Sequence, residues 1–185
     1  MDAAKNASTQ NFFDKIWVKY GLISAGIAIF ITVIYYVVDD TLLADPLFSF
    51  LPLIAILVTA ILAALELRKR QDNYLAYSQS VTTQLGSFSL GLMISTAFNM
   101  ILYLLIDPEL LKKIMNIQIK KLATMVDEGK LPKDAYNEAV RQISEKGSEM
   151  FLFNLLIGVI GLIIVALIIF LISSAILKRE PKTQI

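Results

Sequence analysis

The chain has 185 residues, of which 56% are hydrophobic and 18% are charged, and its formal net charge is +1. Average proteins carry about 25% charged residues, so this composition indicates a membrane protein rather than a soluble domain. The near-zero charge offers no electrostatic attraction to nucleic acid. The absence of Cys and His excludes disulfides, thiol and imidazole chemistry, and most transition-metal sites.

Three apolar segments in the first 106 residues are each long enough to cross a bilayer, for which about 20 residues suffice. The first is residues 17–38, which begins among aromatic and basic residues typical of a membrane interface. The second is residues 47–66, with Pro52 near its start, where a missing backbone N–H costs least. The third is residues 79–106. The pattern therefore predicts three membrane helices before the first long polar segment.

That polar segment, residues 108–147, has the signals of a helical hairpin outside the membrane. Asp107 is a capping carboxylate placed directly before a proline and an acidic residue, a combination typical of a helix start. We expect Gly129 to end the first hairpin helix and Pro132 to begin the second. We expect Gly147 to end the second helix before the membrane is re-entered.

The fourth predicted span, residues 150–177, is the longest apolar run, and residues 151–177 contain no charged residue and no proline. Lys178 and Arg179 follow it directly, as is common where a membrane helix ends. The sequence therefore predicts an all-α membrane protein with one membrane domain, residues 1–185. We expect an antiparallel four-transmembrane-helix bundle, with the extramembrane hairpin between its third and fourth helices.

The distribution of Lys and Arg predicts the orientation of the spans, because cytoplasmic connections are enriched in positive residues. With four spans, the three basic clusters fall on one side of the membrane: Lys5, Lys15 and Lys19; Arg68, Lys69 and Arg70; Lys178, Arg179 and Lys182. The first connection has no positive residue, whereas the long polar connection carries eight, matched by eight acids. We expect both termini in the cytoplasm and the hairpin on the opposite side.

The order of these parts resembles that of domain-of-unknown-function family four-one-nine-nine over nearly the whole chain. The matching features are Leu67-Arg68-Lys69-Arg70, Gly86 and Gly91 in the third span, Ile106-Asp107-Pro108-Glu109-Leu110-Leu111, and the final span ending at Leu177-Lys178. The resemblance implies a small bacterial inner-membrane protein with a periplasmic hairpin and no established activity. It also implies a membrane-protein partner, since genes of this family lie beside those of lipid-linked glycosyltransferases.

Small and polar residues form stripes on two of the predicted spans. Such residues let helix backbones approach closely, and a buried amide can form hydrogen bonds between helices. The stripe on the third span is Ser87, Gly91, Ser95 and Asn99, and its expected counterpart on the fourth is Asn154, Gly158 and Gly161. Gly21 and Ala25 form a weaker pair on the first span. Packing within the monomer is the favoured explanation, and a homo-oligomer or partner interface and a substrate path are the alternatives.

Charged residues gather at both expected membrane surfaces. The carboxylates at the outer surface can in principle bind a divalent cation, although capping and the exclusion of positive residues explain them better. They are Asp39, Asp40, Asp45, Asp107 and Glu109. The basic run of Arg68, Lys69 and Arg70 is explained by topology alone, and the alternative is contact with anionic membrane lipids.

No charged residue interrupts the apolar runs at 21–38, 47–65, 85–106 and 151–177. Proton relays and ion pathways normally need such residues, and no phosphate-binding loop or nucleophile motif occurs either. We therefore expect a non-catalytic accessory or scaffold protein, without cofactor or metal, that binds a membrane partner. Possible partners include a lipid-linked glycosyltransferase or another envelope complex. The alternatives are a small transporter or channel for an uncharged or lipidic substrate, and a membrane enzyme that uses the outer carboxylates.

Overall fold

The computed structural model describes residues 15–178, with side chains except at positions 46, 47, 49, 146 and 148–152. Within this range the chain is helical and contains no strands. The elements in order are α2 (Ile16–Val38), the 3₁₀ turn η1 (Asp40–Ala44), α3 (Pro46–Arg70), α4 (Tyr77–Ile101), the π-helical segment η2 (Leu102–Ile106), α5 (Pro108–Asp127) and α6 (Lys133–Leu177).

Among residues 15–178, four helical segments are long and apolar enough to cross a membrane, which confirms the expectation of an all-helical fold with four membrane-length helices. They are Ile16–Val38, Phe50–Arg70, Tyr77–Ile106 and Phe153–Leu177. Their mean hydropathies over 18 residues are 2.2, 2.5, 1.9 and 3.5, so the last is by far the most apolar. Helices are the expected solution in lipid because each satisfies its own backbone hydrogen bonds.

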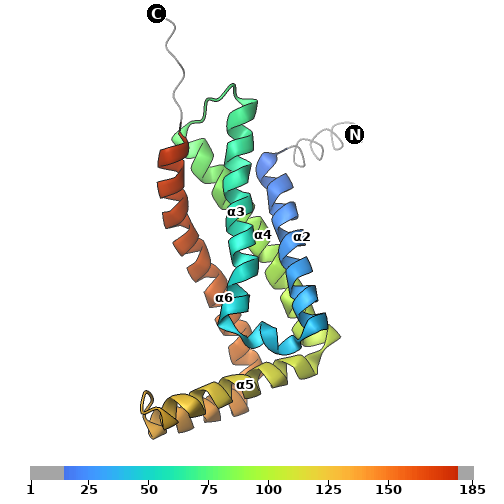
Figure 1. The fold of residues 1–185 in the computed structure, drawn as a ribbon, viewed down its shortest axis with the longest axis vertical. Coiled ribbons are helices and arrows are strands. Elements are labelled where there is room, and N and C mark those ends of the chain that lie inside the picture. Colours follow the sequence, from blue (N-terminus) through green and yellow to red (C-terminus); the bar gives the residue numbers. More distant parts are fainter. Residues whose placement is uncertain (1–14, 179–185) are drawn as a thin grey trace, which may run out of the picture.

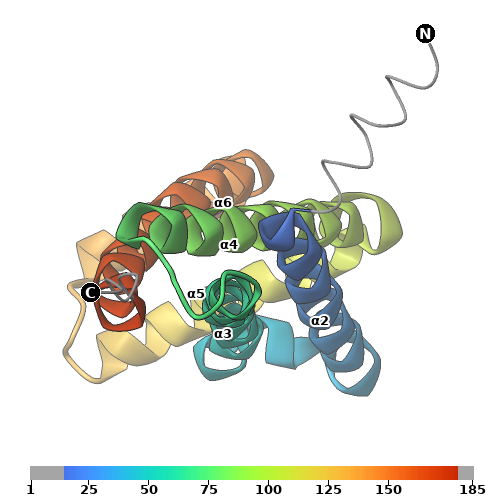
Figure 2. The same ribbon diagram turned by 90° about the horizontal axis from the view of Figure 1, so that it is seen from above.

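Figure 1 shows α2, α3, α4 and the later part of α6 side by side, with α5 lying across one end of the group. In Figure 2, the middle of α6 lies on the other side of α4 from α2 and α3, whereas its end, in red, lies beside the start of α4. The start of α2, the connection from α3 to α4 and the end of α6 lie at one end, which we call the basic end (Figure 1). The opposite end, formed by η1, η2 and α5, is called the acidic end.

Two clusters of buried side chains hold this arrangement together. The first joins the four membrane-length helices through Ala28, Ile56, Ala60, Phe88, Leu92, Ala166 and Phe170. Its aromatic pair, Phe88 and Phe170, meets edge to face with ring centroids 5.5 Å apart. The second attaches α5 at the acidic end through Leu102, Tyr103, Leu110, Leu111 and Ile114. Lipid tails are as apolar as these side chains, so close packing rather than the hydrophobic effect stabilises the first cluster.

The hairpin segment begins as predicted and continues differently. The Asp107 carboxylate caps α5 by accepting a hydrogen bond from the Leu110 N–H, at 3.1 Å, which confirms the capping prediction. Gly129 lies just beyond the end of α5 with a φ of +70°, a conformation in which glycine is favoured. The N–H of Gly129 donates to the Val126 carbonyl and the N–H of Lys130 to that of Met125, as in a Schellman motif.

The expectation that Gly147 ends a helix is wrong. Helix α6 runs without a break through this position from Lys133 to Leu177, so the second hairpin helix and the fourth span are one element. A glycine in a helix interior costs only about 1 kcal/mol relative to alanine, and helix-forming residues on both sides of it offset that cost. The first part of α6 lies beside α5, and the rest continues along α4 (Figure 1).

Candidate functional site

The small-residue stripe of α4 packs against α2. A Cβ atom added at Gly91 would overlap the Ser24 hydroxyl and lie 3.3 Å from the Gly21 carbonyl oxygen. A Cβ added at Gly21 would lie 2.8 Å from Leu90 Cδ2. The close approach of these two helices therefore requires glycine at both positions. The stripe of α4 thus packs within the monomer, against the first span. The expected weaker pair on that span, Gly21 and Ala25, includes one of the glycines that this contact requires.

The stripe of α6 is left without a neighbour. Asn154, Gly158 and Gly161 are all exposed, and a Cβ added at either glycine would have no atom within 4 Å. The structure therefore does not bring these residues against the stripe of α4. Helix α6 contacts α4 closer to the basic end, through residues that include Phe170 and Ser174.

That contact contains a buried network of polar side chains. The Gln84 Nε2 group donates to the Ser80 hydroxyl at 3.0 Å and to the Ser174 hydroxyl at 2.8 Å. The Ser173 hydroxyl donates to Gln84 Oε1 at 2.6 Å, and the Ser174 hydroxyl donates to Ser80 Oγ at 2.9 Å. Gln84, Ser80 and Ser174 are completely buried. The residue pattern alone does not predict this network, although a glutamine within a membrane-length helix is a signal of it.

A second polar cluster, also missed from the sequence, joins α2 to α3 near the basic end. The Glu66 carboxylate accepts hydrogen bonds from the Tyr20 hydroxyl at 2.6 Å and from Arg70 Nη2 at 2.6 Å. Lys19 Nζ lies 3.3 Å from the same carboxylate. The carboxylate is therefore held by two cations and a phenol, an arrangement that fixes the ends of two helices.

The other two basic residues of this run, Arg68 and Lys69, form no ion pair with any residue in the described part of the chain. Lys69 is exposed and Arg68 is partly exposed. Both lie in the last turn of α3, where positive charge is favourable to the helix dipole. The chain turns there through Asp72 and Asn73, whose φ values are +50° and +65°. The lipid-binding and topology interpretations of this run both stay predictions.

The carboxylates at the acidic end connect elements to one another. Asp39 accepts hydrogen bonds from the Thr41 hydroxyl at 2.6 Å and the Thr41 N–H at 2.9 Å, and so caps η1. The hydrogen bond from the Thr41 hydroxyl lowers the pKa of the Asp39 carboxyl most, and the bond from the Thr41 N–H lowers it further. Asp40 forms an ion pair with Lys113 of α5. Asp39 is thus both the residue that ends α2 and the residue that caps the start of η1.

The other acidic residues at this end lie at the boundaries of η1 and α5. Asp107 accepts a hydrogen bond from the Tyr36 hydroxyl at 3.2 Å, in addition to capping α5. Asp45 lies at the end of η1, and Glu109 lies exposed in the first turn of α5. Among residues 15–178 no group of three or more acidic, Cys or His residues is arranged to hold a metal ion.

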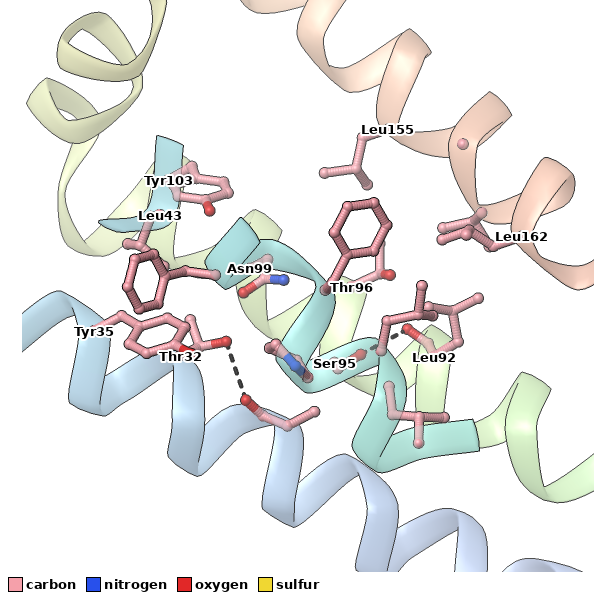
Figure 3. Close-up of a pocket in the computed structure, with 18 of the residues that line it drawn as sticks. Thr32, Tyr35, Leu43, Leu92, Ser95, Thr96, Asn99, Tyr103, Leu155 and Leu162 are labelled. Carbon is pink, nitrogen blue, oxygen red and sulfur yellow. Dashed lines mark hydrogen bonds between the residues drawn. The ribbon is translucent and has the colours of Figure 1, made fainter. Parts of the chain in front are cut away.

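A pocket of about 350 Å³ lies between α2, α3, α4 and α6, toward the acidic end. Figure 3 shows Thr32, Tyr35 and Asn99 on one side of it, with Leu155 and Leu162 of α6 across from them. Thr32 and Ser95 donate their hydroxyl hydrogens to backbone carbonyls of their own helices. The Tyr35 hydroxyl and the Asn99 side-chain oxygen are buried and have no hydrogen-bond partner among the residues that the structure describes. Asn99, which the sequence placed on a packing stripe, therefore lies at this pocket.

No curated protein and no solved structure matches the chain. A family model does match it, over residues 19–179, which contain all four membrane-length helices except the first three residues of α2. The matching family is described as "Protein of unknown function (DUF4199)". Since this match covers most of the 185 residues, the chain belongs to that family.

Proposed function

We propose that the protein is a non-catalytic accessory protein of the bacterial inner membrane, which binds a helix of a partner membrane protein along α6. The observation that carries the proposal is the exposure of this helix. Only 11% of its 18-residue membrane window is buried inside the protein, against 28–33% for the other three. The other three helices pack closely on one another, whereas α6 contacts mainly α4.

The exposed face of α6 has the composition of a helix–helix interface. Gly158 and Gly161 make no close contact within the monomer that would require a glycine. Glycines on a membrane helix allow another backbone to approach, and the exposed Asn154 amide nearby can form hydrogen bonds between helices. Lipid alone would have no need of either feature. The family resemblance favours an envelope enzyme, such as a lipid-linked glycosyltransferase, as the partner.

In the proposed topology, the four helices form an antiparallel bundle, with both termini in the cytoplasm and the α5–α6 hairpin in the periplasm. The basic end carries Lys19, Lys69, Arg70 and Lys178. On the opposite side, residues 39–46 contain no positive residue, whereas residues 107–149 contain eight, matched by eight acids. Positive residues are enriched on the cytoplasmic side, which supports this orientation.

Cysteine labelling tests the orientation directly, because the natural chain contains no Cys. Ser144 on the hairpin and Ser78 at the basic end are both exposed. In intact cells with a permeabilised outer membrane, a membrane-impermeant maleimide should label Ser144→Cys and not Ser78→Cys. The reverse pattern would show that the topology is inverted.

The partner interface is tested by photo-crosslinking in the native membrane with the full chain. A photoreactive residue at Ile164, exposed on α6, should give one crosslinked product containing another membrane protein, identified by mass spectrometry. The same residue at Ile27, exposed on α2, serves as the control position. Products of twice the protein's mass would identify a second copy, and lipid adducts alone would contradict the proposal.

A matched pair of variants makes this test specific. Gly161→Leu places a side chain on the proposed interface, and Gly26→Leu makes the same change on α2, where a Cβ also meets no atom within 4 Å. We expect Gly161→Leu to reduce crosslinking from position 164 at least threefold, and Gly26→Leu to leave it unchanged. Equal effects of the two variants would show that α6 has no specific interface. Transport or channel activity stays an alternative prediction.

A further inference from the structure

The pocket between the four membrane-length helices has the size of a small ligand site. Its volume of about 350 Å³ is near the lower end of the range of about 300–1,000 Å³ found for ligand pockets. Most of its wall is apolar, formed by residues such as Phe48, Ile56, Leu92 and Leu162. None of the described residues that line it is charged. A pocket of this kind excludes an ion and suits an uncharged, largely apolar molecule.

Two polar atoms on this wall lack the partners that their burial requires. Tyr35 is only 9% exposed, and neither its hydroxyl nor the buried Asn99 side-chain oxygen forms a hydrogen bond with any described residue. Buried polar groups in proteins are nearly always hydrogen-bonded, and water is scarce at bilayer depth. Both residues line the pocket, but the two oxygens themselves are almost fully covered. A molecule in the pocket supplies the missing hydrogen bonds only when the side chains over these oxygens shift.

The backbone is also irregular beside the pocket, on two different helices. Pro52 of α3 lines it and lies inside the helix, beyond the first turn in which a missing N–H costs least, contrary to the expectation from the sequence. The Phe48 carbonyl four residues earlier therefore loses its usual helical donor. Tyr103 lines it from η2, where the Asp107 N–H donates to the Leu102 carbonyl five residues earlier, at 2.8 Å. Such π-helical turns are frequent at functional sites. In membranes, irregular backbone is tolerated mainly where it lines a cavity.

We propose that this pocket binds a single uncharged hydrocarbon chain that carries a hydroxyl group. The ligand hydroxyl donates to Asn99 Oδ1, and its oxygen accepts a hydrogen bond from the Tyr35 hydroxyl. The chain lies against the apolar wall formed by α3 and α6. The small volume admits one chain rather than two, and the absence of lining charge excludes fatty acids and phospholipid headgroups. Monoacylglycerols and isoprenoid alcohols both have this chemistry.

The test uses photoreactive probes on the full chain, purified and reconstituted in lipid nanodiscs. The probes are a diazirine-bearing monoacylglycerol, a diazirine-bearing isoprenoid alcohol and a diazirine-bearing fatty acid matched in length. We expect saturable labelling of pocket residues on α2, α3 or α4 by at least one of the two alcohols. The fatty acid should label the pocket at least tenfold less. The preferred alcohol identifies the source of the ligand.

A matched pair of asparagine variants distinguishes the pocket from the outer surface. Asn99→Leu removes the polar atom at the pocket, and Asn154→Leu makes the same change on the exposed face of α6, outside it. We expect Asn99→Leu to weaken probe binding about fivefold, the effect of one lost hydrogen bond, and Asn154→Leu to leave it unchanged. Tyr35→Phe removes a single oxygen and provides the same test if Asn99→Leu does not fold.

Non-saturable labelling, labelling confined to the outer face of α6, equal labelling by the fatty acid, or no pocket labelling would each overturn the proposal. So would equal effects of the two asparagine variants. The proposal stands apart from partner binding: Gly161→Leu is expected to weaken crosslinking to the partner without changing probe binding, because Gly161 does not line the pocket.

Discussion

The buried network around Gln84 predicts how strongly α6 is held against α4. Gln84 takes part in three hydrogen bonds with serine hydroxyls, two of which belong to α6. Gln84→Met removes all three while keeping a side chain of similar length and volume, so the change tests hydrogen bonding rather than packing. Side-chain hydrogen bonds within membranes contribute about 0.6 kcal/mol each on average. The expected loss of unfolding free energy is therefore about 2 kcal/mol.

The measurement is reversible unfolding of the purified protein in mixed micelles with increasing SDS, followed by circular dichroism. Gln79→Met is the matched control, because Gln79 is exposed near the start of the same helix. A double-mutant cycle with Ser174→Ala should give a coupling energy of about 0.6 kcal/mol, since one bond joins the two side chains directly. If Gln84→Met destabilised the protein no more than Gln79→Met, or if the coupling were zero, the network would not hold α6 in place.

Two further predictions concern the acidic end and the contact between α2 and α4. Gly91→Ala should destabilise the fold by about 1–3 kcal/mol in the same SDS assay, because the added methyl group overlaps the Ser24 hydroxyl. Adding Ser24→Ala should recover part of that loss, and the absence of any recovery would contradict the proposed overlap. Thr41→Val should return the lowered pKa of the Asp39 carboxyl toward its ordinary value, as measured by an NMR pH titration, because the hydroxyl bond that lowers it most is lost. Because folding lowers this pKa, the ionised Asp39 carboxylate stabilises the fold above about pH 4, and this stabilisation is lost as the pH falls through the lowered pKa. An unchanged Asp39 titration in Thr41→Val would show that the Thr41 hydroxyl does not lower the pKa.

The features that could be predicted from the sequence are those that depend on local physics. Backbone groups in lipid must be satisfied within the helix, so every span needs a long apolar run, and hydropathy finds it. The cap at Asp107 and the left-handed Gly129 are likewise determined by residues within a few positions of each helix end. Gly147 shows the limit of such rules, because the same residue type is tolerated inside a helix when its neighbours favour helix.

The pairing of helix faces could not be predicted, because it depends on residues far apart in the chain. Gly91 and Gly158 have equivalent sequence contexts, on small-residue stripes of apolar helices, yet one meets Ser24 and the other has no close neighbour. The pocket could not be predicted for the same reason, because residues far apart in the chain form it. Tyr35, Pro52 and Asn99 lie on three different helices, and only the packed arrangement brings them to one cavity. The Glu66 and Gln84 clusters were missed because a lone polar residue near a span does not indicate its partner.

Gly158 of α6 lies both at the pocket and on the stripe proposed to bind a partner. Toward the basic end this helix is attached to α4 by the Gln84 network and by the Phe88–Phe170 contact. Toward the acidic end it forms one wall of the pocket, and there Gly158 belongs both to that wall and to the exposed stripe. A partner helix bound along the stripe would therefore rest against the pocket wall. Any difference in ligand affinity caused by the partner must then be matched by an equal difference in partner affinity caused by the ligand, because coupling between binding sites is reciprocal.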